Sequence, residues 1–77
     1  MEIREVFARN LRKARQAKGL SQEALAHDAG IDRTYISALE RGVYGATIDM
    51  VDKLAVVLKI EASELLQRPT KGRQRKS

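Results

Sequence analysis

Apolar residues recur along the chain at steps of three and four positions, which is the spacing of one face of an α-helix. The first such run consists of Ile3, Val6, Phe7, Leu11 and Ala14. It predicts a helix from about residue 3 to Lys18. Gly19 then ends this helix, because glycine adopts the left-handed conformation of a helix C-terminus without steric cost.

Three polar residues that commonly begin helices divide the following part of the chain. Ser21, Asp32 and Thr47 can each accept a hydrogen bond from a free amide in the first turn of a new helix. They predict one short helix from Ser21 to about Ala29, a second from Asp32 to Arg41, and a third that starts at Thr47. None of the three is followed three residues later by Glu or Gln, so none completes a capping box.

The last part of the chain continues the helical pattern and then becomes polar and basic. The helix after Thr47 has an expected core face of Ile48, Val51, Leu54, Ala55 and Leu58. A final short helix carries Leu65 and Leu66 before Pro69. The whole pattern predicts an all-α domain of five helices over residues 1–68. We expect residues 69–77 to form a basic, disordered tail.

The composition excludes most site chemistry. A chain of 77 residues has room for one domain, and it contains no cysteine and a single histidine, His27. Disulfides and Cys/His zinc sites are therefore excluded, and His27 is expected to be a surface residue. No paired carboxylates, activated nucleophile or phosphate-binding glycine loop is present. We therefore expect no enzyme activity, no catalytic residue, no metal, no cofactor and no small-molecule ligand.

The charge distribution changes the picture only slightly. The formal net charge is +5, but Lys71, Arg73, Arg75 and Lys76 lie in the tail, so residues 1–70 carry only +1. Basicity alone is thus a weak indicator of nucleic-acid binding. The longest apolar run, Leu54 to Leu58, is far shorter than the roughly 20 residues that span a bilayer. With no signal-peptide pattern either, we expect a cytoplasmic protein without a membrane partner, located on the nucleoid if it binds DNA.

The segment from Gln22 to Arg41 is the most informative. Two short helices are separated by a turn around Gly30, and Ala26 supplies a small residue where their backbones approach. The inward positions are held by Leu25, Ala29, Ile31, Ile36 and Leu39. An ordinary helical hairpin has no reason to meet all these requirements, so the pattern favours a helix-turn-helix that places its second helix in the major groove of DNA.

The outward side of that second helix predicts the residues that read bases. Helical arithmetic groups Arg33, Thr34, Ser37, Ala38 and Arg41 on the side opposite Ile36 and Leu39. The N-terminal residues of a recognition helix lie nearest the base edges. Arg33 can therefore donate two hydrogen bonds to guanine, while Thr34 or Ala38 can contact a thymine methyl group. We predict Arg33, Thr34, Ser37 and Ala38 as base-reading residues.

The stretch LRKARQAKGLSQEALAHDAGIDRTYISALERG, followed by TIDMVDKLAVVLKIEASELL, resembles the Cro/C1-type, XRE-like helix-turn-helix family. This family includes phage repressors and restriction-modification controller proteins. The resemblance covers residues 4 to 67 and implies a lambda-repressor-like domain that binds double-stranded DNA and regulates transcription. It also implies base contacts at Arg33, Thr34 and Ala38. The chain departs from the family at Lys59, where glycine or asparagine is usual, and at Ala46, where proline is common.

The resemblance also implies an ion pair between Arg15 and Glu40, which would fix the recognition helix against the first helix. Phosphate contacts are expected to frame the recognition helix and set its register. The predicted phosphate-contacting residues are Gln22, Arg41, Tyr44, Asn10 and Tyr35. Gln22 lies in the first turn of its helix, where free amides favour an anion, and the resemblance gives it the same role. Tyr44 has the alternative of packing against the body of the protein.

The helix after Thr47 has more apolar residues than one core face needs. The surplus residues are Met50, Leu54 and Val57, and Leu65 and Leu66 extend their stripe. They indicate either a wide core or the two-fold interface of a homodimer. A dimer would place two recognition helices about 34–36 Å apart on a (pseudo)palindromic operator. An alternative function is an antitoxin that binds DNA and also a protein partner.

Overall fold

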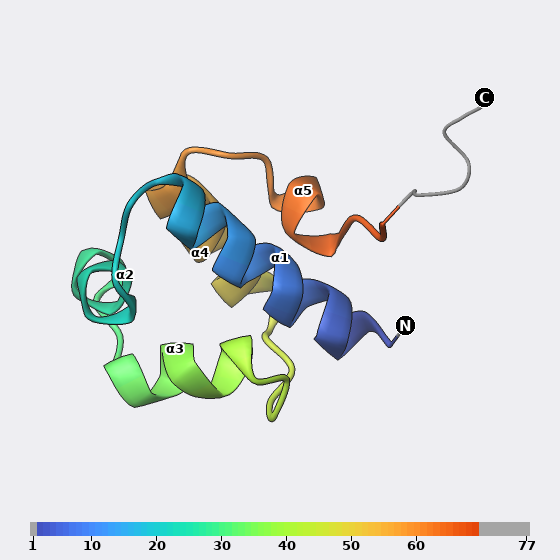
Figure 1. Cartoon of the computed structure of the whole chain (residues 1–77), viewed down its shortest axis with the longest axis horizontal. Helices are drawn as coiled ribbons and strands as arrows, with labels where there is room; N and C mark the ends of the chain where they lie inside the picture. Colours follow the sequence, from blue (N-terminus) through green and yellow to red (C-terminus); the bar gives the residue numbers. More distant parts are fainter. Residues whose placement is uncertain (1, 70–77) are drawn as a thin grey trace.

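The computed structural model describes residues 2–69 and contains five helices, with no strand in that range. They are α1 (Ile3–Ala17), α2 (Gln22–Ala29), α3 (Arg33–Glu40), α4 (Ile48–Leu58) and α5 (Ala62–Leu66). Figure 1 shows α1 crossing the middle of the molecule, with α3 along one side and α5 on the other. The prediction of an all-α, five-helix fold is confirmed. The expected disordered tail falls mainly on residues 70–77, which lie outside the described residues.

Polar caps begin three of the helices, as the sequence predicts. The Ser21 hydroxyl accepts a hydrogen bond of 3.0 Å from the Ala24 amide. The Asp32 carboxylate accepts one of 3.0 Å from Thr34, and the Thr47 hydroxyl accepts one of 3.1 Å from the Met50 amide. Each bond satisfies an amide that has no partner inside its own helix.

The start of α5 was not predicted in detail. Glu61 precedes this helix, and its backbone amide donates a hydrogen bond of 3.0 Å to the Glu64 side chain. The two residues form a capping box that uses glutamate where serine or threonine is more common. This arrangement stabilises a helix of only five residues and fixes where α5 docks.

Four helices are followed by a residue in the left-handed conformation, which is Gly19 after α1, Gly30 after α2, Gly42 after α3 and Lys59 after α4. The predicted glycine end of the first helix is therefore confirmed. Gly30 ends α2 with φ 70°, as expected of glycine. Lys59 ends α4 with φ 60° and is the only non-glycine residue with positive φ among residues 2–69. Lys59, one of the two positions at which the chain departs from the family pattern, therefore has a backbone conformation in which any side chain costs conformational energy.

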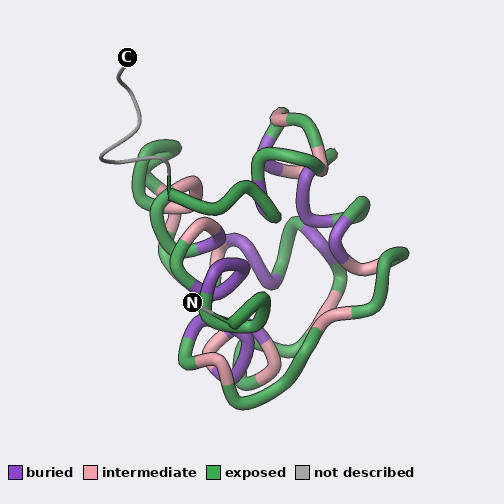
Figure 2. Tube along the Cα trace, turned by 90° about the vertical axis from the view of Figure 1, so that its right-hand side faces the viewer, coloured by how far each residue is buried: buried purple, intermediate pink, exposed green. Residues whose placement is uncertain are grey.

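All five helices contribute to one core. Its buried members are Phe7, Leu11, Leu25, Ala26, Ala29, Ile36, Leu39, Val51, Leu54, Ala55, Leu58 and Leu65. Figure 2 shows these buried stretches lying on the inner sides of the helices. The part of the chain that the structure describes contains no helix long and apolar enough to cross a bilayer.

Two residues differ from their predicted positions in this core. Ile3 and Ile48 were expected inside, but both are exposed, Ile48 by 84%. Each is the first residue of its helix. The helical spacing of apolar residues extends to these positions, but the packing of the neighbouring helices does not. Leu54 and Leu65 are fully buried within one chain. Their burial agrees with the core position predicted for Leu54 and with a wide core as the explanation of this part of the stripe, and it removes both residues from the predicted dimer interface.

Candidate nucleic-acid interface

The helix-turn-helix is formed by α2 and α3, which pack together across a tight turn. At Gly30 the chain turns sharply between the two helices, and the Ile31 amide donates a hydrogen bond of 2.9 Å to the Ala26 carbonyl. Asp32 then begins α3 only two residues after Gly30. The short connection fixes the angle between the helices and leaves one long side of α3 at the edge of the molecule (Figure 1).

The outward side of α3 carries three of the four predicted base-reading residues. Arg33 and Thr34 are exposed, and Ser37 is half-buried. Within residues 2–69 the side chains of Arg33 and Ser37 make no hydrogen bond and no ion pair, while the Thr34 side chain is engaged with the Asp32 carboxylate. The polar atoms of Arg33 and Ser37 are therefore available to a partner that lies along α3.

Ala38 does not belong to this surface, and its prediction as a base-reading residue is not supported by the structure. Its exposed fraction is only 5%. The loop after α3 folds back, and the Val43 amide donates a hydrogen bond of 3.0 Å to the Ala38 carbonyl. In the same loop the Tyr44 ring lies 6.3 Å from the Tyr35 ring, centroid to centroid. Helical arithmetic places Ala38 outward, but the folded protein buries it.

A buried ion pair holds the inner side of α3. The Arg15 Nε donates to Glu40 Oε2 at 2.6 Å, and Nη2 donates to Oε1 at 3.1 Å. The exposed fractions of the two side chains are 12% and 3%. The third nitrogen of Arg15 donates to the Leu20 carbonyl at 2.7 Å. The pair therefore has the two-bond geometry that the resemblance implied, and it ties α1 to the end of α3.

Two further side chains complete this inner network. Gln22 Nε2 donates to Glu40 Oε1 at 3.1 Å, so α2 joins the same carboxylate. Arg12 Nη2 donates to the Glu40 carbonyl at 2.7 Å. Arg12 lies three residues before Arg15 on the same helix and was not among the predicted site residues. With both its carboxylate and its carbonyl occupied, Glu40 fixes the orientation of α3 relative to α1 and α2.

The electrostatics of the start of α3 centre on Asp32. The pKa of its carboxyl is lowered, first by the hydrogen bond from the Thr34 backbone amide, then by the Thr34 side chain, and also by the charge of Arg33. The ionised carboxylate stabilises the N-terminal turn of α3, and the lowered pKa keeps it ionised at a lower pH than an ordinary aspartate.

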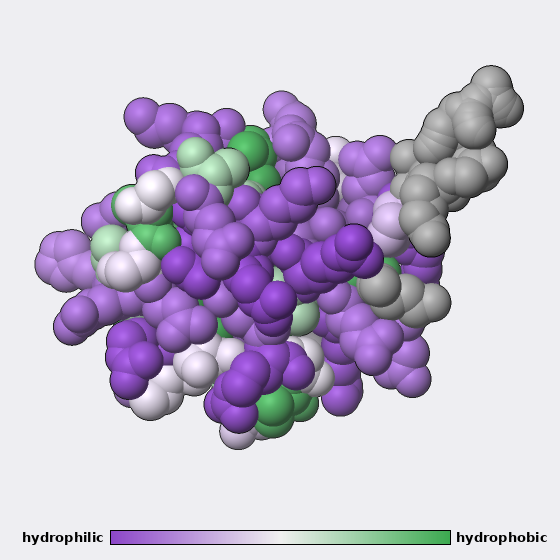
Figure 3. All heavy atoms as spheres, viewed as in Figure 1, coloured by the Kyte–Doolittle hydropathy of each residue, from purple (hydrophilic) through white to green (hydrophobic). Residues whose placement is uncertain are grey.

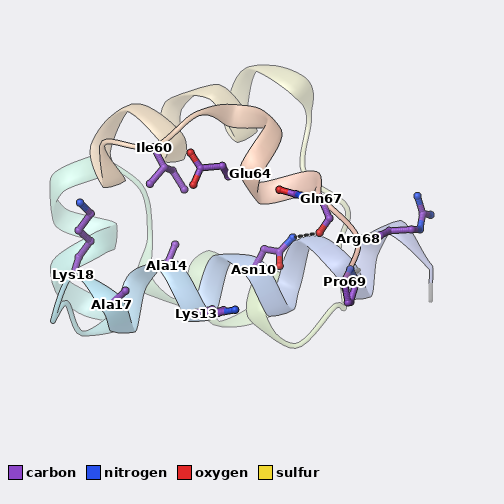
Figure 4. Close-up of a pocket in the computed structure, with 10 residues that line it drawn as sticks. All are labelled: Asn10, Lys13, Ala14, Ala17, Lys18, Ile60, Glu64, Gln67, Arg68 and Pro69. Carbon is purple, nitrogen blue, oxygen red and sulfur yellow. Dashed lines mark hydrogen bonds between the residues drawn. The ribbon is translucent and has the colours of Figure 1, made fainter. Parts of the chain in front are cut away.

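Asn10 faces away from α3, so the structure does not support its prediction as a phosphate contact. Its side-chain amide donates to the Leu65 carbonyl at 3.0 Å and to the Gln67 carbonyl at 2.8 Å. Figure 4 shows the Gln67 bond, with Lys13 on the same stretch of α1 beside the pocket under α5. Asn10 therefore holds the end of α5 against α1.

The other predicted phosphate-contacting residues remain accessible in different degrees. Arg41 is exposed, and its Nε donates to the Ser37 carbonyl at 3.3 Å. Tyr44 is exposed and its ring faces the half-buried Tyr35. Both alternatives for Tyr44 are thus present, because it packs on α3 while most of its surface stays open.

Nothing in residues 2–69 groups three or more metal-ligating side chains. The arrangement is instead a rigid scaffold with one helix presented outward, which defines a helix-turn-helix protein. The helix-turn-helix family profile matches residues 11–65. The chain belongs to the Cro/C1-type, XRE-like helix-turn-helix family.

The chain is similar to regulators from several bacteria. It is 43% identical over 88% of its length to a hypothetical transcription factor of Neisseria meningitidis, of which it spans 64%. The crystal structure of that Neisseria factor matches 91% of the chain and 80% of the solved chain with a TM-score of 0.87. Control protein C.BamHI of Bacillus amyloliquefaciens is 37% identical, over 91% of this chain and 88% of the relative.

One solved controller protein supports the same fold. The restriction-modification controller protein C.AhdI of Aeromonas hydrophila is 45% identical and has a TM-score of 0.77. The match covers 80% of this chain and 94% of C.AhdI.

Proposed function

We propose that the protein is a sequence-specific regulator of transcription that inserts α3 into the major groove of double-stranded DNA. The observation that carries this proposal is the asymmetry of α3. Its inner side is fixed through Glu40 by Arg15, while the side chains of Arg33 and Ser37 on its outer side have no hydrogen-bond or ion-pair partner among the described residues. Family membership and the similarity to a transcription factor and to control proteins support it.

In this proposal Arg33 is the principal base reader. It stands at the first position of α3 and is exposed, so its guanidinium can donate two hydrogen bonds to guanine O6 and N7. Thr34 and Ser37 lie beside it and reach neighbouring base edges. Each good two-bond contact contributes about 1–3 kcal/mol to discrimination between base pairs.

The phosphate contacts of this proposal lie around the recognition helix. Gln22 is held by Glu40 in the first turn of α2, where the backbone amides favour an anion. Arg41 and Tyr44 lie at and just beyond the C-terminal end of α3, and the Tyr35 ring packs near the Tyr44 ring. These contacts set the register of the helix and carry no base preference of their own.

We also propose that two copies bind DNA together. Of the predicted interface residues, Met50 and Val57 are half-buried and Leu66 is exposed, so these three remain available on α4 and α5. An isologous interface through them would give the pair two-fold symmetry and a (pseudo)palindromic site.

Sedimentation velocity of paired variants tests this interface. Val57→Asp should give monomers, because it places a charge within the contact. Val56→Asp is the matched control, since Val56 is 67% exposed and lies on the adjoining side of α4. Dissociation by Val56→Asp, with Val57→Asp still dimeric and folded, would place the interface on the wrong side of the helix.

The finer proposal is a controller-type regulator of restriction-modification genes, supported by the similarity to C.BamHI and C.AhdI. Fluorescence anisotropy tests the function with a labelled duplex that covers the region upstream of the protein's own gene. A specific regulator should prefer it over a shuffled duplex by about 1,000-fold or more at physiological salt. Equal affinity for both duplexes would contradict sequence-specific regulation at that site.

A further inference from the structure

We infer that a hollow between α1 and the end of α3 binds a phosphate of the same DNA duplex that α3 reads. The hollow has a volume of about 440 Å³ and is lined by Glu5, Arg9, Arg12, Arg41 and the segment Glu40–Gly42. We call it the arginine hollow. The inference rests on the proposed function, and it assigns DNA contacts to Arg9 and Arg12 on α1.

The charges around the arginine hollow favour an anion. Arg9, Arg12 and Arg41 bring three guanidinium groups to its walls. Glu5 is the one carboxylate there that is not already engaged, because the carboxylate of Glu40 is bonded to Arg15 and Gln22. The three guanidinium groups repel one another in the free protein, and the single free carboxylate offsets only part of this repulsion. A bound phosphate would relieve the rest.

Two of the three guanidinium groups are already oriented. Arg12 Nη2 donates to the Glu40 carbonyl at 2.7 Å, and Arg41 Nε donates to the Ser37 carbonyl at 3.3 Å. Each keeps further N–H groups free, since a guanidinium has five donors. A side chain fixed before binding loses less entropy when a phosphate arrives. Arg9 is exposed at the rim and completes the set.

The arginine hollow is placed next to a proposed phosphate contact. Glu40 lies between the two, with Gln22 on its carboxylate and Arg12 on its carbonyl. A DNA strand that follows the edge of the groove past Gln22 would therefore continue toward Arg9. The face that shows α1 and α3 is covered mainly by hydrophilic residues, as a surface that meets a charged backbone requires (Figure 3).

The salt dependence of DNA binding by the full chain tests this inference. Affinity for the specific duplex is measured by anisotropy over a series of KCl concentrations. Arg9→Gln should weaken binding about tenfold, equally for specific and shuffled duplexes, and reduce the slope of log K against log [salt] by about 1. Arg12→Gln should do the same, with its thermal melt measured to separate binding from folding.

Lys13→Gln is the matched control, because it removes one positive charge from the same helix on the side that faces α5 (Figure 4). Its salt slope should equal that of the wild type. If Arg9→Gln and Lys13→Gln give the same slope, the arginine hollow does not contact phosphate.

Glu5→Gln provides a test of opposite sign. Removing the free carboxylate should tighten binding by about threefold, because its repulsion of the phosphate is lost. Asp52→Asn, on an exposed position of α4, is the control and should leave the affinity unchanged. Equal effects of the two substitutions would show a general charge effect and overturn the inference.

These outcomes separate the two proposals. If the wild type shows no preference for any duplex, the proposed function itself fails. If the wild type binds specifically and Arg33→Ala removes a base preference, while Arg9→Gln behaves as Lys13→Gln does, only the arginine hollow is wrong.

Discussion

The two sides of α3 differ in almost every respect that the structure records. The inner side is buried and ends in Glu40, whose carboxylate and carbonyl together receive hydrogen bonds from Arg15, Gln22 and Arg12. The outer side carries Arg33 and Thr34, which are both exposed; the Arg33 side chain makes no hydrogen bond or ion pair within the described residues, and the Thr34 side chain is engaged only with the neighbouring Asp32.

This difference separates two roles that one short helix has to combine. A helix of eight residues is too short to be stable alone, so its orientation must come from tertiary contacts. Because those contacts all lie on the inner side, residues on the outer side can change without loss of the fold. Stability is therefore set by one side of α3 and DNA sequence preference by the other.

The largest expected effect comes from breaking the inner side. Arg15→Ala should lower the free energy of unfolding by about 3 kcal/mol, because it leaves the buried Glu40 carboxylate without its charge partner. Urea denaturation followed by circular dichroism measures this change. Lys18→Ala is the control at an exposed position of the same region, and a loss from Arg15→Ala no larger than from Lys18→Ala would contradict the role of the pair.

Changing the outer side should weaken DNA binding and leave the stability of the fold nearly unchanged. Arg33→Ala should weaken binding to the specific duplex by about 10- to 100-fold, which corresponds to about 1–3 kcal/mol. The melting temperature should change little, because Arg33 makes no hydrogen bond or ion pair and its charge has only a minor effect on Asp32. Lys53→Ala, which removes a positive charge from the exposed side of α4, should leave the affinity nearly unchanged. A drop in stability with unchanged affinity would reverse the roles of the two sides.

A smaller effect is expected away from both sides, at the end of α4. Lys59→Gly should raise the free energy of unfolding by about 0.5 kcal/mol, because glycine adopts φ 60° without steric cost. DNA affinity should not change. Lys53→Gly in the interior of the same helix should instead cost about 1 kcal/mol. Destabilisation by both substitutions would show that the Lys59 side chain contributes a contact that outweighs its strained backbone.

The smallest effect concerns the cap of α3. The Asp32 pKa is lowered in the folded protein, so ionised Asp32 stabilises the fold at pH values above its ordinary pKa of 3.8. This contribution is lost as the pH falls through the lowered pKa. The melting temperature of the wild type should therefore exceed that of Asp32→Asn at neutral pH and converge with it in acid. A difference that grows on acidification would contradict the origin of the pKa shift.

The sequence predicted the features that depend on neighbouring residues. Ser21, Asp32 and Thr47 cap their helices because a hydroxyl or carboxylate reaches an amide two or three residues later, whatever the rest of the fold does. The left-handed turn at Gly30 follows from the backbone of glycine itself. These local rules were enough to give five helices and the outward side of α3.

Features that depend on distant segments could not be derived in this way. Ala38 is buried although helical arithmetic places it outward, because that arithmetic does not include the rest of the fold. Asn10 is bonded to backbone atoms 55 and 57 positions away, at the end of α5. Leu65 is buried for the same reason, because the docking of α5 decides what remains on the surface.

The claim that the outer side of α3 reads base pairs is tested most directly by selecting binding sites from random duplex DNA with the wild type and with Arg33→Ala. We predict that the wild type selects a two-fold symmetric site, and that the variant loses its preference at one base pair in each half-site. Selection of the same motif by both proteins would contradict the central claim.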